Sequence, residues 1–422
     1  MHVALTLTVF LLTLSLMFLR PRGLSEAWAA VIGAALMLAF GLTTWRQAQI
    51  TIGQGAGVLL FLFALMLLSG LLEQSGFFEW AAILAARSSR GEARILFRNV
   101  FLLGFAITAL LSLDTTAIIL TPIVAAFISR LRLPSKPYLI ACAFVANCGS
   151  LLLPVSNLTN LLFASAFHLS FGRFTLIMAL PQFAAILANY LAFRYLFRHQ
   201  FGQDFDRRPI PDSLSVLPDR IFFAASLLVL GVVLIGYFAG SLLGIPPYLI
   251  ALGGCAVLLL VGAARRRIAW KRLSGEISLP LFVFVIGLFV VVRGVENLGL
   301  AGIAAGMLDS GRSPLTQILI SAFGAAIGAN IINNIPMGLL AISIIKSAGA
   351  SGSALYGALL GCNIGPNLTL AGSLATMLVI TSARKRGENI GAWDFLRAGL
   401  FTTPLVLLAS CLALWIALLV AR

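Results

Sequence analysis

The stretch LGCNIGPNLTLAGSLATML, from Leu360 to Leu378, decides the architecture of this chain. It is long and apolar enough to cross a membrane, yet its middle holds two asparagines, a proline and the pair Gly372-Ser373. Pro366 removes a backbone donor and the glycines favour open backbone, so a continuous helix is excluded. Irregular backbone at membrane depth is tolerated only where it faces protein or a polar cavity. The stretch therefore predicts a broken helix that forms half of a binding site.

The composition around this stretch is that of an all-α, polytopic membrane protein. Of the 422 residues, 60% are hydrophobic and 10% are charged, and the mean hydropathy is +1.03, far above that of soluble domains. The net charge of +15 lies in clusters at segment ends, which the positive-inside rule explains without a nucleic-acid partner. The five cysteines lie inside apolar segments without CxxC spacing, so neither a disulfide framework nor a zinc site is indicated. No other metal site and no cofactor is expected.

Basic clusters set the predicted topology. Lys and Arg concentrate in segments that we therefore place in the cytoplasm: 20–22, 87–98, 130–136, 198–220, 265–272 and 384–386. This arrangement puts both termini on the external side of the lipid bilayer. It also makes residues 45–54 an external loop, and the aromatic segment Ser75–Ala86 an interfacial helix on the cytoplasmic side.

A long apolar run, residues 99–129, is interrupted near its midpoint by Asp114-Thr115-Thr116 and has basic clusters at both ends. Both ends therefore favour the cytoplasm, and an arm of about 15 residues reaches only ~22 Å as a helix. We predict a re-entrant hairpin whose tip, at Asp114, stops inside the membrane. Two full spans with a tight turn at Asp114 are the competing interpretation, but they would be marginal helices.

Three further segments carry polar interruptions. Residues 138–167 are too long for one simple span and hold the sequence NCGSLLLPVSNLTN, so they predict the first broken helix. Residues 314–345 are apolar around three asparagines and a proline, which predicts a second hairpin, entering from the external side. Residues 353–383 contain the opening stretch and form the second broken helix. An outer amphipathic segment, residues 296–312, precedes the second hairpin.

The two halves of the chain match each other. Asn147 aligns with Asn363, and the pair Ser156-Asn157 with Gly372-Ser373, at one constant offset. Each half contains three spans, a hairpin, a broken helix and a final span, and this odd number of crossings forces opposite orientations. We predict inverted repeats over residues 1–197 and 221–422, joined by a cytoplasmic linker, 198–220. The fold would have about ten transmembrane helices, with a site where the repeats meet.

The candidate site residues lie at the four interruptions. Asp114 is the acidic residue placed deep in the membrane, where a charge costs roughly 2.5–3.5 kcal/mol on insertion scales, so we assign it proton coupling. The alternative is a structural carboxyl bonded to hairpin amides. The candidate substrate-binding residues are Thr115, Thr116, Asn147, Cys148, Ser156, Asn157, Asn160, Asn330, Asn333, Asn334, Cys362, Asn363, Gly372 and Ser373. Helix packing explains any one such cluster equally well, and the two cysteines could be inert packing groups.

Four runs of the sequence carry a family resemblance. They are LLEQSGFFEWAA (71–82), ILTPIV (119–124), VSNLTN (155–160) and GCNIGPNLTLAGSLATML (361–378). In these runs the chain resembles the ArsB-type arsenite efflux permeases of the ion transporter superfamily. The resemblance implies a secondary transporter of the bacterial inner membrane that exports arsenite or antimonite in exchange for protons. It also implies a separate cytoplasmic ATPase as an optional partner, and an oligomer is compatible with it. The sequence LDTT at 113–116 departs from the family's Asn-Asp-Gly-Ala but retains the aspartate.

Other functions stay open from the residues alone. Superfamily relatives carry dicarboxylates with sodium, so the substrate has to be argued from the site. No Arg or Lys lies at the broken centres, and Asp114 would repel a dicarboxylate, whereas neutral As(OH)₃ matches Asn, Ser and Thr side chains. A sodium–proton antiporter is the main alternative, because Asp114 and freed carbonyls could bind sodium. A membrane-embedded hydrolase is disfavoured, since it requires a second facing aspartate or a buried base.

Overall fold

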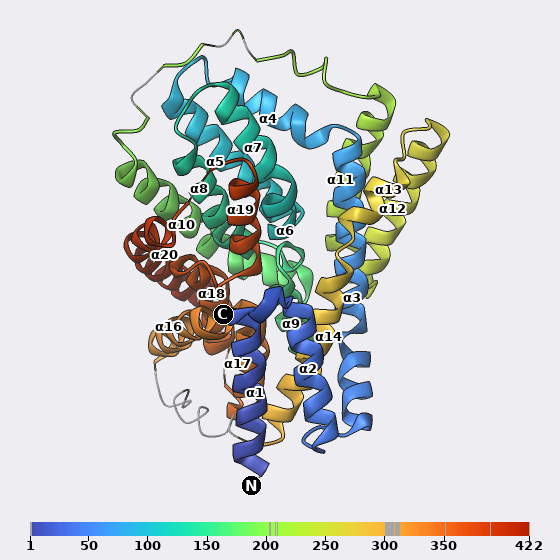
Figure 1. The fold of residues 1–422 in the computed structure, drawn as a ribbon, viewed down its shortest axis with the longest axis vertical. Coiled ribbons are helices and arrows are strands. Elements are labelled where there is room, and N and C mark those ends of the chain that lie inside the picture. The colour runs from blue at the N-terminus through green and yellow to red at the C-terminus, as the bar shows by residue number, and fades with distance from the viewer. Residues whose placement is uncertain are drawn as a thin grey trace.

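The computed structural model describes residues 2–201, 204–206, 208, 210–299, 308, 313–350, 352–388 and 390–421. Within these ranges every regular element is helical, as predicted (Figure 1). The longer helices are α1 (His2–Leu19), α2 (Glu26–Ala39), α3 (Trp45–Gln74), α4 (Phe77–Arg87), α5 (Ala93–Leu110), α7 (Thr121–Arg130), α8 (Ser135–Cys148), α9 (Leu158–Ala166), α10 (Phe171–Leu196), α11 (Arg220–Leu243), α12 (Pro247–Ala264), α14 (Leu279–Glu296), α16 (Pro314–Ile332), α17 (Asn334–Ala348), α18 (Gly352–Ile364), α19 (Leu374–Lys385) and α20 (Ala392–Val420). The predicted amphipathic segment 296–312 lies almost entirely outside the described residues.

The described helices confirm a multi-pass membrane protein. Nine of them, among the residues described, are long and apolar enough to cross a membrane. Helices α1, α2 and α17 are apolar but shorter. The perimeter carries many exposed large hydrophobic side chains, such as Phe183 and Leu242, which are 76% and 89% exposed. Such a surface fits lipid contact and is incompatible with a soluble fold.

Helix α3 corrects one prediction. Residues 45–54 are not an external loop but the first turns of α3, which runs for 30 residues. Thr44 and Gln47 form a capping box, in which the Thr44 hydroxyl accepts from the Gln47 amide at 3.2 Å and the Gln47 side chain accepts from the Thr44 amide at 2.9 Å. The pattern T-x-x-Q marks a helix start in any environment. The hydropathy of these residues is low, so a prediction from hydropathy alone puts the start of this helix too late in the chain.

Two helical hairpins occupy opposite ends of the molecule. In Figure 1, α5 and α7 lie in the upper part, while α16 and α17 lie in the lower part. The first hairpin begins at Ala93 rather than at residue 99. Its helix breaks at Leu111 and Ser112, not at Asp114 as predicted. Ser112 is extended, and its hydroxyl accepts from the Thr115 amide at 3.1 Å, so this serine restarts the helix and Asp114 falls in the first turn.

The helix after Ser112 contains a short wide turn. It is formed by α6 (Leu113–Thr115), a π-helical turn (Thr116–Leu120) and α7, which together form one continuous helical segment from Leu113 to Arg130. In the wide turn the Thr116 carbonyl pairs with the backbone amide of Thr121, five residues later instead of four. The Thr121 hydroxyl also donates to this carbonyl, at 2.8 Å. π-Turns of this kind are rare and often occur at functional sites.

Both broken helices are present where the sequence predicts them. Helix α8 ends at Cys148, two 3-10 turns follow at Gly149–Leu151 and Pro154–Ser156, and α9 begins at Leu158. Likewise α18 ends at Ile364, a 3-10 turn covers Gly365–Leu368, and α19 begins at Leu374. In both cases the interruption contains a proline and two or more small polar residues. The two broken helices thus share one pattern, in which 3-10 turns separate a first helix from a second.

Three glycines spaced four residues apart hold α18 against α16. Gly357, Gly361 and Gly365 face α16, where an added Cβ would overlap the backbone of Ile318, Ala322 and Ala326. Small residues at this spacing let two membrane helices approach until their backbones touch. Packing is therefore the role of these glycines, and the broken helix is positioned by the first arm of the second hairpin.

Gly361→Ala is expected to destabilise the protein by about 3 kcal/mol, the upper end for overpacking, because its new methyl group meets backbone that cannot rotate away. The measurement is the unfolding midpoint of the purified protein in detergent. Gly253→Ala in α12 is the matched control, since nothing lies within 4 Å of a Cβ added there. Equal midpoints for the two variants would contradict this account of the α16–α18 contact.

Candidate functional site

Four helices begin at one place in the middle of the molecule. They are the segment starting at Leu113, α9, α17 and α19, so each hairpin and each broken helix contributes one helix N-terminus. Each start is capped by the side chain of a small polar residue, which accepts a hydrogen bond from the first-turn amide: Ser112, Asn157, Asn333 and Ser373. A helix N-terminus carries partial positive charge and unpaired amide donors. Four of them together suit a ligand rich in oxygen atoms.

A small cavity lies between these helix ends. Its volume is about 20 Å³, room for one water-sized molecule. The lining residues are Leu113, Asp114, Asn157, Leu158, Leu281, Asn334, Ile335, Ser373, Leu374 and Ala375. Asp114 is the only ionisable residue among them and is partly accessible. No hydrogen bond or ion pair to its carboxylate occurs within the described parts of the chain, so Asp114 faces the cavity without a fixed partner.

Beside the cavity, asparagines tie the two broken helices together. Asn147 donates to the Thr376 hydroxyl at 3.0 Å, and Asn363 donates to the Asn160 side-chain oxygen, Oδ1, at 2.9 Å. The two pairs are equivalent under the same sequence offset that relates Asn147 to Asn363. Asn363 also accepts from Asn157, and from the Ser150 hydroxyl at 3.1 Å. This reciprocity is what a two-fold axis between related repeats would produce.

The second hairpin is fastened to the second broken helix. Asn330 donates to the Gly365 carbonyl at 2.7 Å and accepts from the Thr369 hydroxyl at 2.8 Å. Asn333, at a φ of 75°, donates to the Ala371 carbonyl at 3.2 Å. The Asn334 amide donates to the Gly372 carbonyl at 3.0 Å. The hairpin tip and the unwound backbone after Pro366 therefore form one hydrogen-bonded unit.

The remaining candidate residues are not among those that line the cavity. Thr115 pairs with Ser69 on α3 at 2.8 Å, and Thr116 pairs with Thr108 on α5 at 2.7 Å, so both threonines fix the hairpin. The Ser156 hydroxyl donates to the Ala109 carbonyl at 2.6 Å. Cys148 and Cys362 are fully buried as free thiols, and Cys148 accepts from the Asn367 amide at 3.0 Å. The structure thus brings Asp114, Asn157, Asn334 and Ser373 together at the cavity and leaves the others in supporting networks.

Sequence reasoning missed several polar members of these networks. Asn367 accepts from Asn147 at 2.8 Å, and Gln182 on α10 accepts from the Leu151 amide and donates to the Cys148 carbonyl, both at 2.8 Å. Asn367 follows Pro366 directly, which was an available signal. Gln182 follows Pro181 within a long apolar helix, and a lone glutamine there also marks a buried polar contact. Neither signal says which side chain faces the cavity.

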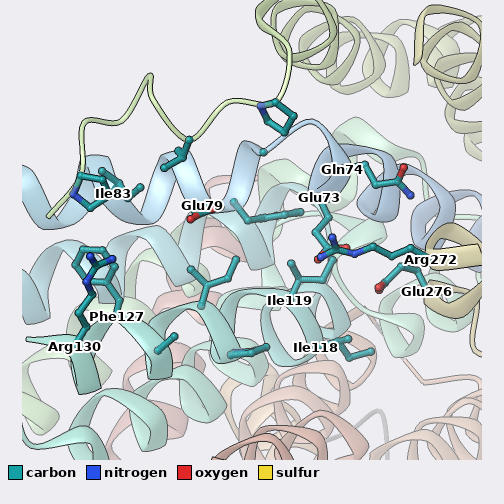
Figure 2. Close-up of a pocket in the computed structure, with 18 of the residues that line it drawn as sticks. Glu73, Gln74, Glu79, Ile83, Ile118, Ile119, Phe127, Arg130, Arg272 and Glu276 are labelled. Atoms are coloured by element: carbon teal, nitrogen blue, oxygen red, sulfur yellow. The ribbon is translucent and has the colours of Figure 1, made fainter. Parts of the chain in front are cut away.

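A second, larger cavity opens at the end of the molecule that carries the basic clusters. Its volume is about 570 Å³, and it lies between α3, α4, α7 and the segment before α11. Figure 2 shows Glu79 pointing into it from α4, Ile118 and Ile119 along its floor, and Arg130 at one end. Ile118, Pro122 and Arg130 line it, and they follow Asp114 at multiples of four residues along one helical segment. Asp114 in the small cavity and Ile118 in the large one are thus about one helical turn apart on the same segment.

Ion pairs shape this basic end of the molecule. Arg272 reaches Glu73 at 2.5 Å beside Glu276, at the other end of the large cavity (Figure 2). Arg265 donates to Asp219 at 2.8 Å, and this bond holds the pKa of the Asp219 carboxyl below its usual range. Asp219 in turn caps α11. We expect these carboxylates to order the segment that connects the two halves.

The comparisons with known proteins agree with this architecture. The family model described as arsenical pump membrane protein, ArsB, matches residues 5–418. The chain belongs to the ArsB family. Among its relatives, the arsenical pump membrane protein of Yersinia enterocolitica is 33% identical over 416 residues, covering 96% of this chain and 97% of that protein. The protein of the same name from Escherichia coli K12 is 32% identical over 417 residues, covering 96% and 97%. Membership of the ArsB family makes this chain a membrane transporter of arsenicals rather than an enzyme.

Two solved transporter structures share the ArsB-type fold. The YdaH transporter of Alcanivorax borkumensis, described as having an unusual topology, superposes with a TM-score of 0.60 at 15% identity, covering 90% of each chain. MtrF of Neisseria gonorrhoeae, described among antimetabolite efflux pumps, superposes with a TM-score of 0.53 at 13% identity, covering 84% of this chain and 80% of that one. At these identities the likeness concerns the fold alone.

Proposed function

We propose that this transporter exports arsenite, or antimonite, as the neutral trihydroxide in exchange for protons. The observation that carries the proposal is the convergence of four capped helix N-termini and one unpaired carboxyl, Asp114, on a single small cavity. Amide donors and the amide and hydroxyl groups of Asn157, Asn334 and Ser373 match the oxygens of As(OH)₃. Asp114 accepts a hydrogen bond from a substrate hydroxyl more strongly while it is deprotonated, because the ionised carboxylate is the better acceptor.

Competition at Asp114 couples the two fluxes. In the deprotonated state the carboxylate accepts from a bound As–OH group, and a proton arriving from outside weakens that hydrogen bond and favours release of the substrate. Substrate and proton then disfavour each other's binding by the same factor, as linkage requires. The cavity holds only one water-sized molecule, so the helix ends must separate to admit the trihydroxide.

The same geometry ranks the alternative substrates. The partial positive charge of four helix N-termini opposes a bare sodium ion, which favours carbonyl oxygens and helix C-termini. A dicarboxylate would be repelled by the Asp114 carboxylate, and the cavity lining contains no Lys or Arg to offset that repulsion. Sodium–proton antiport and anion transport are therefore less well supported than exchange of a neutral hydroxylated solute.

Further parts of the proposal concern membrane arrangement and partners. We place the large cavity at the cytoplasmic side as the entrance for substrate, because Arg130, Arg272 and Arg386 line it. Both chain termini then lie outside the inner membrane.

Residues 1–197 and 221–422 form the inverted repeats, and the reciprocal asparagine contacts support this division. A cytoplasmic ATPase and an oligomeric assembly are optional partners that the transport cycle itself does not require.

Arsenite uptake into everted membrane vesicles tests the proposal. We expect accumulation against a concentration gradient when the vesicle interior is acid, and none after a protonophore collapses the pH difference. Imposing a sodium gradient without a pH difference should have no effect. Accumulation that follows the sodium gradient, or that requires neither gradient, would refute proton exchange.

A further inference from the structure

Four arginines line a third cavity that the transport proposal does not use. Arg94 and Arg98 come from the first turns of α5, and Arg194 and Arg198 come from the end of α10 and the turn after it. The cavity has a volume of about 340 Å³. The lining residues are Arg94, Ile95, Phe97, Arg98, Tyr190, Arg194, Arg198 and Phe201, with no carboxylate among them.

These arginines are not neutralised within the protein. None of the four forms an ion pair with any residue that the structure describes. Arg98 donates to Asn99 at 3.3 Å, and Arg198 lies over the Tyr195 ring at 4.9 Å and donates to His199 at 3.1 Å, and none of these partners is a carboxylate. Like charges held this close repel each other even at the surface. An external anion would remove that repulsion.

The floor of the cavity is rigid and aromatic. Phe97 and Phe201 are buried, with ring centroids 4.4 Å apart, and Phe97 stacks on Tyr190 at 6.3 Å. Packed rings restrict the backbone on which the arginines stand, so the four guanidinium groups surround a shaped hollow rather than a flexible surface. Guanidinium groups bind phosphate oxygens in a bidentate, planar geometry.

Toward the membrane interior the same helix faces become apolar. Leu102 lies one turn beyond Arg98 on α5 and is 47% exposed. On α10, Leu191 and Leu187 precede Arg194 by about one and two turns and are 51% and 57% exposed. A cationic hollow at a helix end that continues into an exposed leucine stripe matches a headgroup with its acyl chains.

We propose that this cavity binds the phosphodiester headgroup of an anionic phospholipid of the cytoplasmic leaflet. The bound lipid would bridge α5, the first arm of the first hairpin, to α10, the last helix of the first half. A lipid headgroup and free inorganic phosphate both present phosphate oxygens to the arginines, so the free ion is the alternative ligand. The leucine stripes favour the lipid, because its acyl chains can pack against them and a free phosphate ion cannot. This proposal rests on the cytoplasmic placement of the basic end given under the proposed function, and not on the identity of the transported solute.

Binding of fluorescent phosphatidylglycerol to the purified protein in neutral detergent tests the proposal. The variant R94Q/R98Q/R194Q/R198Q should bind it at least about tenfold more weakly, since each arginine near an anionic headgroup contributes severalfold. The control R90Q/R132Q/R266Q/K271Q removes the same charge from the same side at exposed residues outside the cavity and outside every ion pair of the described chain. Its affinity should change less than twofold.

Further measurements distinguish the lipid from free phosphate as the ligand, and a further variant controls for misfolding. With wild-type protein, phosphatidylglycerol should raise the thermal midpoint, whereas phosphatidylcholine and millimolar inorganic phosphate should not. R98K/R194K keeps the charge but loses the bidentate geometry, so it should fold and bind with intermediate affinity. Equal weakening in the cavity variant and the control would overturn the proposal in favour of a general surface potential. Competition by millimolar phosphate would overturn the lipid as the ligand.

Discussion

Asp114→Asn is expected to abolish uphill arsenite transport while leaving the protein folded. Asparagine has nearly the volume of aspartate and resembles its protonated form, but it cannot release a proton. Because Asp114 lines the small cavity and has no fixed partner in the described chain, its replacement breaks no internal hydrogen bond. Without the titrating carboxyl, proton and substrate can no longer compete, so accumulation in everted vesicles should fall to the level of equilibration.

The same variant should lose the pH dependence of arsenite binding. In the wild type, affinity should rise with pH as the carboxyl deprotonates and becomes the stronger hydrogen-bond acceptor. Asp212→Asn is the matched control, since it removes the same charge from an exposed ion pair with Arg87, where an exposed pair contributes little. It should transport normally. If Asp114→Asn kept wild-type accumulation and pH dependence, the proton would travel elsewhere, with Glu73 and Glu276 in the large cavity as the next candidates.

Asn363→Leu is expected to destabilise the protein more than any surface change. Asn363 is fully buried, donates to Asn160 at 2.9 Å and to the Leu359 carbonyl at 2.8 Å, and accepts from Ser150 and Asn157. Leucine leaves these groups buried without partners, at about 1–3 kcal/mol each. The loss should exceed about 3 kcal/mol and should appear as a lower unfolding midpoint in detergent.

Asn189→Leu is the control for that result. Asn189 on α10 is equally buried, but its side-chain nitrogen and oxygen have no hydrogen-bond partner among the described residues. Replacing an unpaired buried amide with an apolar side chain should be neutral or stabilising. A similar loss of stability in both variants would show that the Asn363 network adds nothing beyond the volume of the side chain.

The broken helices and hairpins could be predicted because their signals are local. Proline and glycine near residues 149–154 and 365–372 interrupt helices wherever they occur, and apolar length sets the spans. The break of the first hairpin was misplaced by two residues, because the sequence offers both Ser112 and Asp114 as helix starts. Only the packed structure shows that Ser112 supplies the cap and that Asp114 faces the cavity.

The sequence by itself determined that this is a membrane transporter whose apolar segments carry four polar interruptions. Hydropathy, helix breakers and basic clusters act over short stretches of chain, so these features need no knowledge of contacts. The tertiary structure alone decided which polar side chains face the cavity and which pair with each other. Thr115 and Asn157 look alike as candidates, yet Thr115 pairs with Ser69 and Asn157 caps a helix at the cavity. Such assignments depend on partners such as Asn363, which lies 206 residues from Asn157 and meets it only through the packing of the two halves.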